Sequence, residues 1–266
     1  MNTTEQTHQQ DLERLKSLRY MDDDFMTVCL ADNFEGVELI LRIILERKDI
    51  KIKSVRTQEP LKNLQGRSAI LDVHAIDSTD KEFDVEIQRK DAGAGAKRAR
   101  YNSSLLDAHI LKSGDNTEDI PDSYVIFITE NDVMKGNQPI YPVERYVIIG
   151  ENKVLFGDGS HIIYVNGKYR GNDEIGKLMH DFSCTNPDDM NYEALAKMAR
   201  YFKQDEKGVA KMCKIMEDMR NEKAKEVRID NALRMIKDGE LSLEKIALYS
   251  GLSVDEVKEL ATPVMA

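Results

Sequence analysis

The alternation of hydrophobic and polar residues is clearest between Ala69 and Asp91, where it predicts a β-hairpin. Two stretches alternate with a period of two, which places every second side chain on the same face of a strand. Between them lies the polar segment 77–80, which is typical of a tight turn. The first strand carries Asp72 and His74 on its polar face. The polar face of the second strand carries four residues, namely Asp84, Glu86, Gln88 and Lys90.

Antiparallel pairing of the two strands brings Asp72 close to Glu86 on the shared polar face. Two carboxylates held this close repel each other unless a proton or a cation lies between them. Mg²⁺, which binds carboxylate and water oxygens, suits such a pair. His74 lies on the same face, but a histidine on a sheet more often makes a structural hydrogen bond than acts as a base or a ligand. We therefore predict a divalent-cation site on the hairpin.

The hydrophobic pattern around the hairpin predicts a mixed α/β (α+β) fold. An apolar stripe predicts a helix over about residues 35–46, capped by Asp32 or Asn33, with Glu38 off the centre of the stripe. Another helix is predicted over about 96–111. Strands are predicted over four further segments, namely 49–57, 124–129, 143–149 and 161–165. Segment 124–129 is almost entirely apolar, as in a strand buried on both faces, and the preceding helix makes it parallel to the hairpin.

The remainder of the chain has a helical pattern. We expect residues 1–10 to be disordered and residues 11–19 to form a short helix. Longer helices are predicted over about 187–202 and 207–237. In the tail, two short helices flank Gly251, and a capping box starts the second one. This tail resembles a helix-turn-helix, but its second helix is acidic, which favours packing or protein contact over the reading of base edges.

Composition and charge limit the classes of function. The net charge of −10 argues against a protein that coats nucleic acid. The segment 89–100 is an exception, because it concentrates five cationic residues, namely Arg89, Lys90, Lys97, Arg98 and Arg100. No apolar run is long enough to span a membrane and the first ten residues are polar, so we expect a cytoplasmic protein without membrane contact. The three cysteines lack both disulfide and zinc spacing.

The order of several segments resembles the PD-(D/E)XK nucleases, and within them the Rpn-type recombination-promoting nucleases and related transposases. The resemblance rests on the following segments: MDDDFM at 21–26, VELILRIIL at 37–45, LKNLQGRSAILDVHA at 61–75, FDVEIQR at 83–89, KRARYNSSLLDAHIL at 97–111, SYVIFITENDV at 123–133, HIIYVNG at 161–167 and IGKLMHDFSC at 175–184. It implies a restriction-endonuclease-like mixed β-sheet flanked by helices. We divide the chain into an N-terminal segment 1–20, a nuclease-like domain 21–185, a helical extension 186–238 and a tail 239–266.

The resemblance implies a DNA endonuclease that depends on Mg²⁺ or Mn²⁺. The metal ligands would be Asp72, Glu86 and the carbonyl of Ile87. Glu38 would lie at the edge of the site, as a glutamate of the first helix does in this fold. Gln88 stands where the motif has a lysine, and it can hold a water but supplies no charge. The missing cation would come from Lys90 or Arg98.

Residues that follow the second strand would contact DNA. These are Lys90, Lys97, Arg98, Arg100 and Tyr101. Their position directly after the acidic strand favours contact with phosphates over an ordinary solvated helix face.

Two alternatives stay open at this point. Gln88, the acidic total charge and the acidic tail helix are equally consistent with a weak or inactive nuclease fold that only binds DNA or a protein. In the simpler alternative, Asp72 and Glu86 are solvated strand acids that lie apart. Cleavage of both strands of a duplex would favour a homodimer with paired sites.

Overall fold

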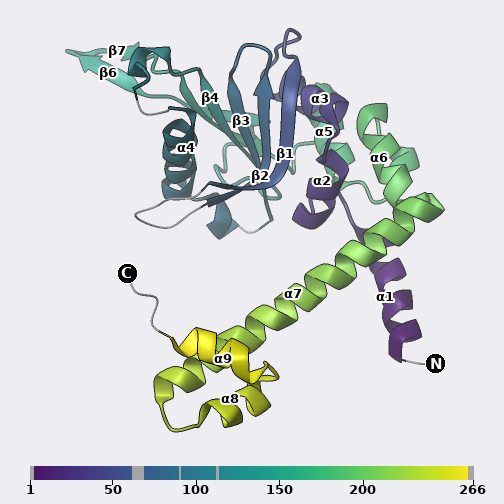
Figure 1. Cartoon of the computed structure of the whole chain (residues 1–266). Coiled ribbons are helices and arrows are strands. Elements are labelled where there is room, and N and C mark those ends of the chain that lie inside the picture. The colour runs from purple at the N-terminus through teal and green to yellow at the C-terminus, as the bar shows by residue number, and fades with distance from the viewer. Residues whose placement is uncertain (1–2, 62–68, 90, 112–113, 263–266) are drawn as a thin grey trace. The chain divides into compact units, whose positions relative to one another are not determined.

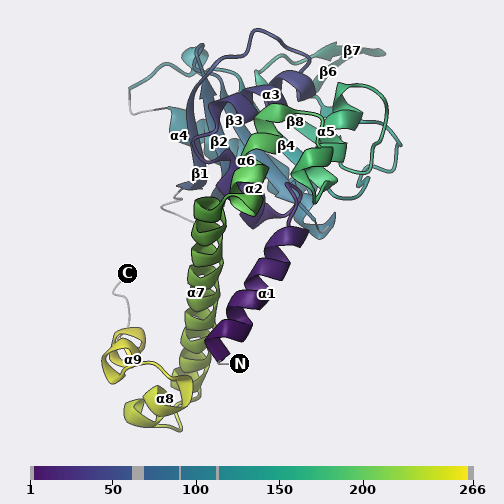
Figure 2. The same cartoon turned by 90° about the vertical axis from the view of Figure 1, so that its right-hand side faces the viewer.

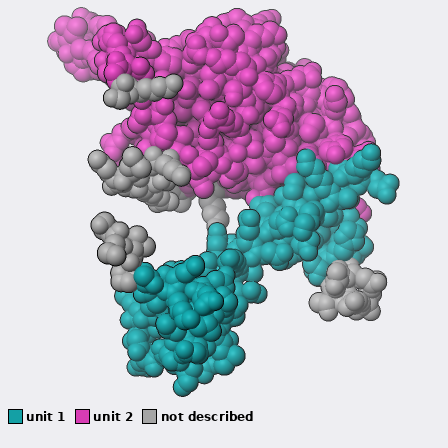
Figure 3. Space-filling view, in the orientation of Figure 1, with its two compact units in different colours: residues 1–12, 206–266 teal, residues 13–205 magenta. Residues whose placement is uncertain are grey.

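A computed structural model describes residues 3–61, 69–89, 91–111 and 114–262 of the chain. The chain forms two compact units, of which the larger comprises residues 13–205. The smaller comprises residues 1–12 together with 206–266 (Figure 3). Each unit is described separately below.

The larger unit is built on a mixed, six-stranded sheet with the strand order β1-β2-β3-β4-β8-β5. Its strands are β1 (Ile52–Leu61), β2 (Ala69–Asp77), β3 (Glu82–Gln88), β4 (Ser123–Thr129), β5 (Ile140–Val143) and β8 (Ser160–Asn166). β1, β2 and β3 are antiparallel neighbours, whereas β4 runs parallel to both β3 and β8. Every residue of β4 is buried, as its apolar sequence predicts for a strand covered on both faces.

The predicted hairpin is confirmed as β2 and β3. Val73 pairs with Val85 and His74 with Asp84, so the two polar faces coincide. The turn between the strands is closed by Asp77, whose carboxylate accepts hydrogen bonds from the backbone N–H groups of Thr79 at 2.7 Å and of Lys81 at 3.1 Å. The polar residues of the turn therefore determine where the hairpin reverses, and with it the register of the strands.

Helices cover both faces of this sheet (Figures 1 and 2). These helices are α2 (Asp23–Leu30), α3 (Phe34–Ile44), α4 (Ala96–Ile110), α5 (Glu174–Ser183) and α6 (Glu193–Gln204), with short 3₁₀ turns at Asp91–Ala94, Thr117–Asp119 and Pro187–Asp189. A further helix, α1 (Thr3–Ser17), begins in the smaller unit and ends in the larger one. α4 lies on one face, and α2 and α3 lie on the other, with α5 and α6 against them. As predicted, Asn33 caps α3, and its side chain accepts a hydrogen bond from the N–H of Gly36 at 3.0 Å. The fold class is therefore the expected one.

The prediction of one strand over 143–149 was wrong. β5 ends at Val143 and pairs with β8, and the chain then leaves the sheet. Its continuation forms a separate hairpin of β6 (Tyr146–Ile149) and β7 (Asn152–Leu155), turned at Gly150 with φ 62°. The break falls at Glu144 and Arg145, and the sequence interpretation missed it because periodicity alone does not tell which strand pairs with which.

Two helix boundaries also differ from the prediction. The helix expected from Pro187 begins at Glu193, because the buried carboxylate of Asp181 accepts hydrogen bonds from the N–H groups of Asn191 and Tyr192, both at 2.8 Å, and holds this backbone outside the helix. The expected disorder of residues 1–10 is contradicted over residues 3–10, which belong to α1, while residues 1–2 lie outside the described residues. Within the smaller unit, the carboxylate of Asp11 pairs with the guanidinium of Arg220 at 2.9 Å.

The smaller unit contains α7 (Glu206–Asp238), α8 (Leu243–Ser250) and α9 (Val254–Ala261). Gly251 ends α8 in the left-handed conformation with φ 72°, and Ser253 with Glu256 forms the predicted capping box. A small apolar cluster joins the three helices, made of Ala232, Ile246, Ala247, Leu252 and Val257. Within the described part of the chain, no helix combines the length and the apolar character needed to cross a bilayer.

Candidate functional site

The structure brings Asp72 and Glu86 together where the β2–β3 ladder ends. Val73 and Val85 form the last pair of the ladder, and Asp72 and Glu86 are the next residues of the two strands beyond that pair. The Asp72 carboxylate accepts a hydrogen bond from the N–H of Ile87 at 3.1 Å. Asp72 is 7% exposed and Glu86 is fully buried. The alternative in which these acids are solvated and lie apart is therefore excluded.

Asp84 is a third buried acid, and the sequence interpretation did not select it. It lies two residues before Glu86 on the same face of β3, opposite His74, and it is fully buried. Its one hydrogen bond in the described structure comes from the Asn102 amide on α4, at 3.4 Å. The signal was present in the alternation of β3, which places Asp84 and Glu86 on one face. We refer to Asp72, Asp84 and Glu86 as the acid cluster.

Burial and mutual repulsion both destabilise the charged forms of the acid cluster. Burial, followed by the charges of Glu86 and Asp23, raises the pKa of Asp72 to about 8. Burial and the charges of its two neighbours raise the pKa of Asp84 well above its usual value. Burial also raises the pKa of Glu86, although the positive charge of Arg98 opposes this effect. Among the described residues, Asp84 Oδ1 and Glu86 Oε1 have no hydrogen-bond partner.

Among the described residues, Arg98 is the cation that pairs with the acid cluster. From α4, its Nη2 lies 2.5 Å from Glu86 Oε2, and its Nη1 donates to Gln88 Oε1 at 2.9 Å. The same Nη1 also donates to the carbonyl of Gly93 at 3.2 Å. Gly93 must lack a side chain here, because a Cβ would come within 1.9 Å of Gln88 Oε1. Gln88 therefore positions the positively charged guanidinium of Arg98.

The other residues expected to contact DNA have different environments. Lys97 and Arg100 are exposed on α4, on the turn that carries Arg98. Tyr101 is partly buried and packs against the apolar cluster between α4 and the sheet. Lys90 lies outside the described residues.

Glu38 is not brought to the acid cluster. Its carboxylate lies 2.5 Å from Arg42 Nη2 and accepts a hydrogen bond from the N–H of Ile52 at 3.0 Å, so it joins α3 to the start of β1. The acid that acts on the cluster is instead Asp23, at the start of α2, whose charge raises the pKa of both Asp72 and Glu86. Its signal in the sequence was the MDDDFM segment, which carried part of the family resemblance.

A ring of ion pairs lies next to Asp23 along the chain. The Asp22 carboxylate accepts from the backbone N–H of Arg19 at 2.8 Å and from Arg89 Nη1 at 2.7 Å. Glu130, directly after β4, accepts from Arg19 at 3.0 Å and from Arg89 at 3.1 Å. The ring thus joins the start of α2 to the ends of β3 and β4.

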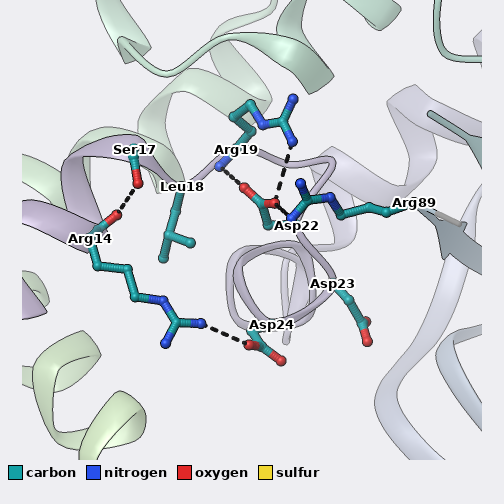
Figure 4. A pocket seen from close by; sticks show the side chains of 8 residues that line it. All are labelled: Arg14, Ser17, Leu18, Arg19, Asp22, Asp23, Asp24 and Arg89. Atoms are coloured by element: carbon teal, nitrogen blue, oxygen red, sulfur yellow. Dashed lines mark hydrogen bonds and ion pairs between the residues drawn. The ribbon is translucent and has the colours of Figure 1, made fainter. Parts of the chain in front are cut away.

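Beside this ring lies a cavity of about 390 Å³ (Figure 4). Its lining residues are Arg14, Ser17, Leu18, Arg19, Asp22, Asp23, Asp24 and Arg89. In Figure 4, Asp23 points away from the ion pairs that Asp22 and Asp24 make. The arginines of the cavity pair with Asp22, Asp24 and Glu130. Asp23 instead hydrogen-bonds Thr27 and interacts with the charge of Arg98.

The donor atoms of the acid cluster fit a hard divalent cation. Carboxylate oxygens are the ligands that Mg²⁺ and Mn²⁺ prefer, and two of the buried oxygens lack partners. The side chains do not form a finished cage, since no three His, Cys, Asp or Glu residues of the described chain are arranged to hold a metal ion. Arg98 takes one oxygen of Glu86 and leaves the other without a partner.

A comparison with family models identifies one match, to the family described as PD-(D/E)XK nuclease family transposase, over residues 38–245. No curated protein and no solved structure matches the chain. The matched range includes β2, β3 and α4, and therefore the whole acid cluster with Gln88 and Arg98.

Proposed function

Because the chain belongs to the PD-(D/E)XK nuclease family of transposases, we propose that it is a Mg²⁺-dependent endonuclease that hydrolyses phosphodiester bonds in DNA. The observation that carries this proposal is the acid cluster itself. Three buried carboxylates share one site, and two of their oxygens have no hydrogen-bond partner among the described residues. Either a proton, which the raised pKa values of Asp72 and Asp84 favour, or a cation relieves such repulsion, and a divalent metal supplies the largest relief.

Asp72, Glu86 and the Ile87 carbonyl would hold the metal, with Asp84 as the additional acid. The N–H of Ile87 donates to Asp72, while the Gln88 carbonyl accepts from the N–H of Glu130 on the opposite side of β3. Since the N–H and C=O of one strand residue point to the same side, the Ile87 carbonyl is directed toward Asp72. A bound Mg²⁺ lowers the pKa of a coordinated water and neutralises charge on the phosphate under attack.

Arg98 and Gln88 together would take the part of the lysine in the family motif. Gln88 has one amide oxygen that accepts from Arg98 and an NH₂ group 3.5 Å from Glu86 Oε2. Arg98 supplies the positive charge next to the acids, where charge develops on the phosphate. Its guanidinium lies 5.8 Å from the centre of the Phe127 ring, which limits the orientations it can take.

The DNA backbone would approach along α4. Lys97 and Arg100 are exposed beside Arg98, and neutralising phosphates is the usual function of such residues. Tyr101 supports this surface by packing beneath it. Lys90, which follows Arg89, extends the same cationic segment in the sequence.

Plasmid cleavage tests the proposal. The purified chain should nick or linearise plasmid DNA when Mg²⁺ or Mn²⁺ is added, and Asp72→Asn or Glu86→Gln should reduce the rate by about 100-fold or more. Glu38→Gln should retain activity, because Glu38 makes its contacts away from the acid cluster. Undiminished cutting by both cluster variants would contradict the proposal.

A second candidate function is a nuclease fold that binds DNA or protein without cleaving. It is favoured by Gln88 in place of a lysine and by the contact of Arg98 with Glu86, which occupies one of the oxygens a metal would use. Calorimetric titration with Mn²⁺ separates the two candidates. An endonuclease requires metal affinity that disappears in Asp72→Asn, whereas a binding module requires none.

A further inference from the structure

The hairpin of β6 and β7 exposes an unusual concentration of apolar side chains. All four residues of β6, together with Val154, Leu155 and Phe156, are large and apolar, and their exposed fractions lie between 41% and 63%. The hairpin projects from the body of the larger unit in both views (Figures 1 and 2), and its strands pair only with each other in the described structure. Exposed apolar surface of this extent marks an interaction site, and an isolated two-stranded hairpin is marginally stable by itself.

The hydrogen-bond pattern of the hairpin shows which residues of β6 face its free edge. The N–H of Phe156 donates to the carbonyl of Arg145 at 2.9 Å, and the register then pairs Val147 with Val154 and Ile149 with Asn152. Because hydrogen-bonded and non-hydrogen-bonded pairs alternate along an antiparallel ladder, these pairs bond across the hairpin. The backbone groups of Tyr146 and Ile148 therefore point outward, to the free edge of β6.

We propose that β6 is a homodimer interface, in which the free edges of two copies pair antiparallel about a two-fold axis at Val147. In this register Tyr146 of one copy forms hydrogen-bonded pairs with Ile148 of the other, and Val147 faces its own copy. The result is a four-stranded sheet with the order β7-β6-β6-β7 across the two chains. The proposal goes beyond the nuclease activity and does not depend on it.

The sequence of β6 favours a second copy of the same chain as its partner. β6 reads Tyr-Val-Ile-Ile, so self-pairing in this register places Tyr146 opposite Ile148 and Val147 opposite Val147 of the second copy. An isologous contact uses the same patch on both partners, and β6 is complementary to itself in this sense.

Pairing of two copies also covers free strand edges. Arg145, directly before β6, forms an ion pair with Asp158 of its own chain, so its charge is compensated without a second copy. The interface therefore rests on backbone hydrogen bonds and apolar contacts, and it covers two strand edges that are apolar and otherwise open to uncontrolled association.

Two pairs of matched variants of the full chain test the interface. Sedimentation equilibrium at micromolar concentration should give twice the 30.4 kDa mass of one chain for the unmodified protein. Ile148→Pro removes an N–H from the free edge of β6, and it should weaken dimerisation by roughly tenfold or more because two symmetric hydrogen bonds are lost. Lys153→Pro, which removes an outward N–H from the opposite edge of the hairpin, should leave the dimer intact.

Disulfide trapping tests the register. A facing non-hydrogen-bonded pair has Cα atoms about 4.5 Å apart, which a disulfide can span, so Val147→Cys should form a covalent dimer on mild oxidation. Val154→Cys, its neighbour on β7, should stay uncrosslinked, as should the unmodified chain with its own cysteines. A monomeric protein, a dimer that survives Ile148→Pro, or equal trapping of both cysteine variants would overturn the proposal.

Discussion

The two ends of the β2–β3 hairpin carry similar residues in opposite electrostatic conditions. At one end lies the acid cluster of Asp72, Asp84 and Glu86. At the other end lies a histidine cluster, in which the ring nitrogens of His74 contact Glu59 and, at 2.9 Å, Glu82. Glu59 also accepts from Arg56 at 2.6 Å, so its charge is compensated twice.

The contrast is sharpest across a single strand pair. His74 lies directly opposite Asp84, yet both of its ring nitrogens are taken by Glu59 and Glu82. The His74 ring therefore compensates Glu59 and Glu82 and not the acid cluster. Acids that only stabilise the fold are compensated within the chain, whereas two oxygens of the acid cluster have no partner among the described residues. This is the expected condition of a site that binds a cation from solution.

The largest difference between the two ends should be in activity. Asp84→Asn should lower the rate of Mg²⁺-dependent plasmid cleavage by about 100-fold, because it removes one of the charges that the metal neutralises. Glu82→Gln, at the other end of β3, should change the rate by less than about twofold, since no step requires its charge. Initial rates of nicking compare the two, and equal losses would show that the ends do not differ in function.

Stability of the metal-free protein should change in the opposite direction. Asp84→Asn should raise the free energy of unfolding by about 1–2 kcal/mol, because an amide avoids the cost that burial and the neighbouring acids impose on the Asp84 carboxyl. Glu59→Gln should lower it by about 1–3 kcal/mol, since His74 loses a charged partner. Urea denaturation in EDTA measures both. A loss of stability in Asp84→Asn would mean that the acid cluster is not under strain.

A smaller effect is expected from the glycines that precede α4. Gly93→Ala should displace Gln88, loosen its contact with Arg98 and slow cleavage by roughly tenfold, because a Cβ would come within 1.9 Å of Gln88 Oε1. Gly95→Ala is the matched control, as a Cβ at Gly95 meets no atom within 4 Å. Unchanged cleavage by the Gly93 variant would remove Gln88 from the proposed site.

The smallest effect is a dependence of stability on pH at the histidine cluster. Burial alone lowers the pKa of His74, but hydrogen bonds to Glu82 and Glu59 outweigh it and raise the pKa above 6.5. The folded state therefore binds this proton more tightly than the unfolded state does. The resulting stability is complete below pH 6.5 and is lost as the pH rises through the raised pKa. Denaturation curves of the wild type and His74→Gln should converge as the pH rises, and a constant difference would contradict this assignment.

The local sequence pattern predicted much of the fold and, within the site, the proximity of two of the three acids. Alternation predicted the hairpin and the proximity of Asp72 to Glu86, and capping residues predicted the start of α3 and the tail helices. These features depend on neighbours in sequence, or on two strands joined by a short turn. The family resemblance added the class of protein, which the family match then confirmed.

Other features depended on contacts between residues far apart in the sequence. Glu38 was expected at the site, but Arg42 and the backbone of Ile52 hold it elsewhere, and Asp23 acts on the acid cluster instead. The unsatisfied state of Asp84 was equally invisible, because alternation shows the face of a residue and not what covers it. The hairpin of β6 and β7 was missed because the sequence pattern does not show that only β5 pairs with β8 and that the chain then leaves the sheet.

The sequence by itself determined which residues alternate, where the turns and caps lie, and to which family the chain belongs. The tertiary structure decided which charges are compensated. Periodicity acts over a few residues, whereas the energy of a buried carboxylate depends on every group within several ångströms, including those that the chain brings back after tens of residues. His74 is close to the acid cluster in sequence, yet its ring nitrogens contact Glu59 and Glu82. Arg98, from the following helix, pairs with Glu86 instead.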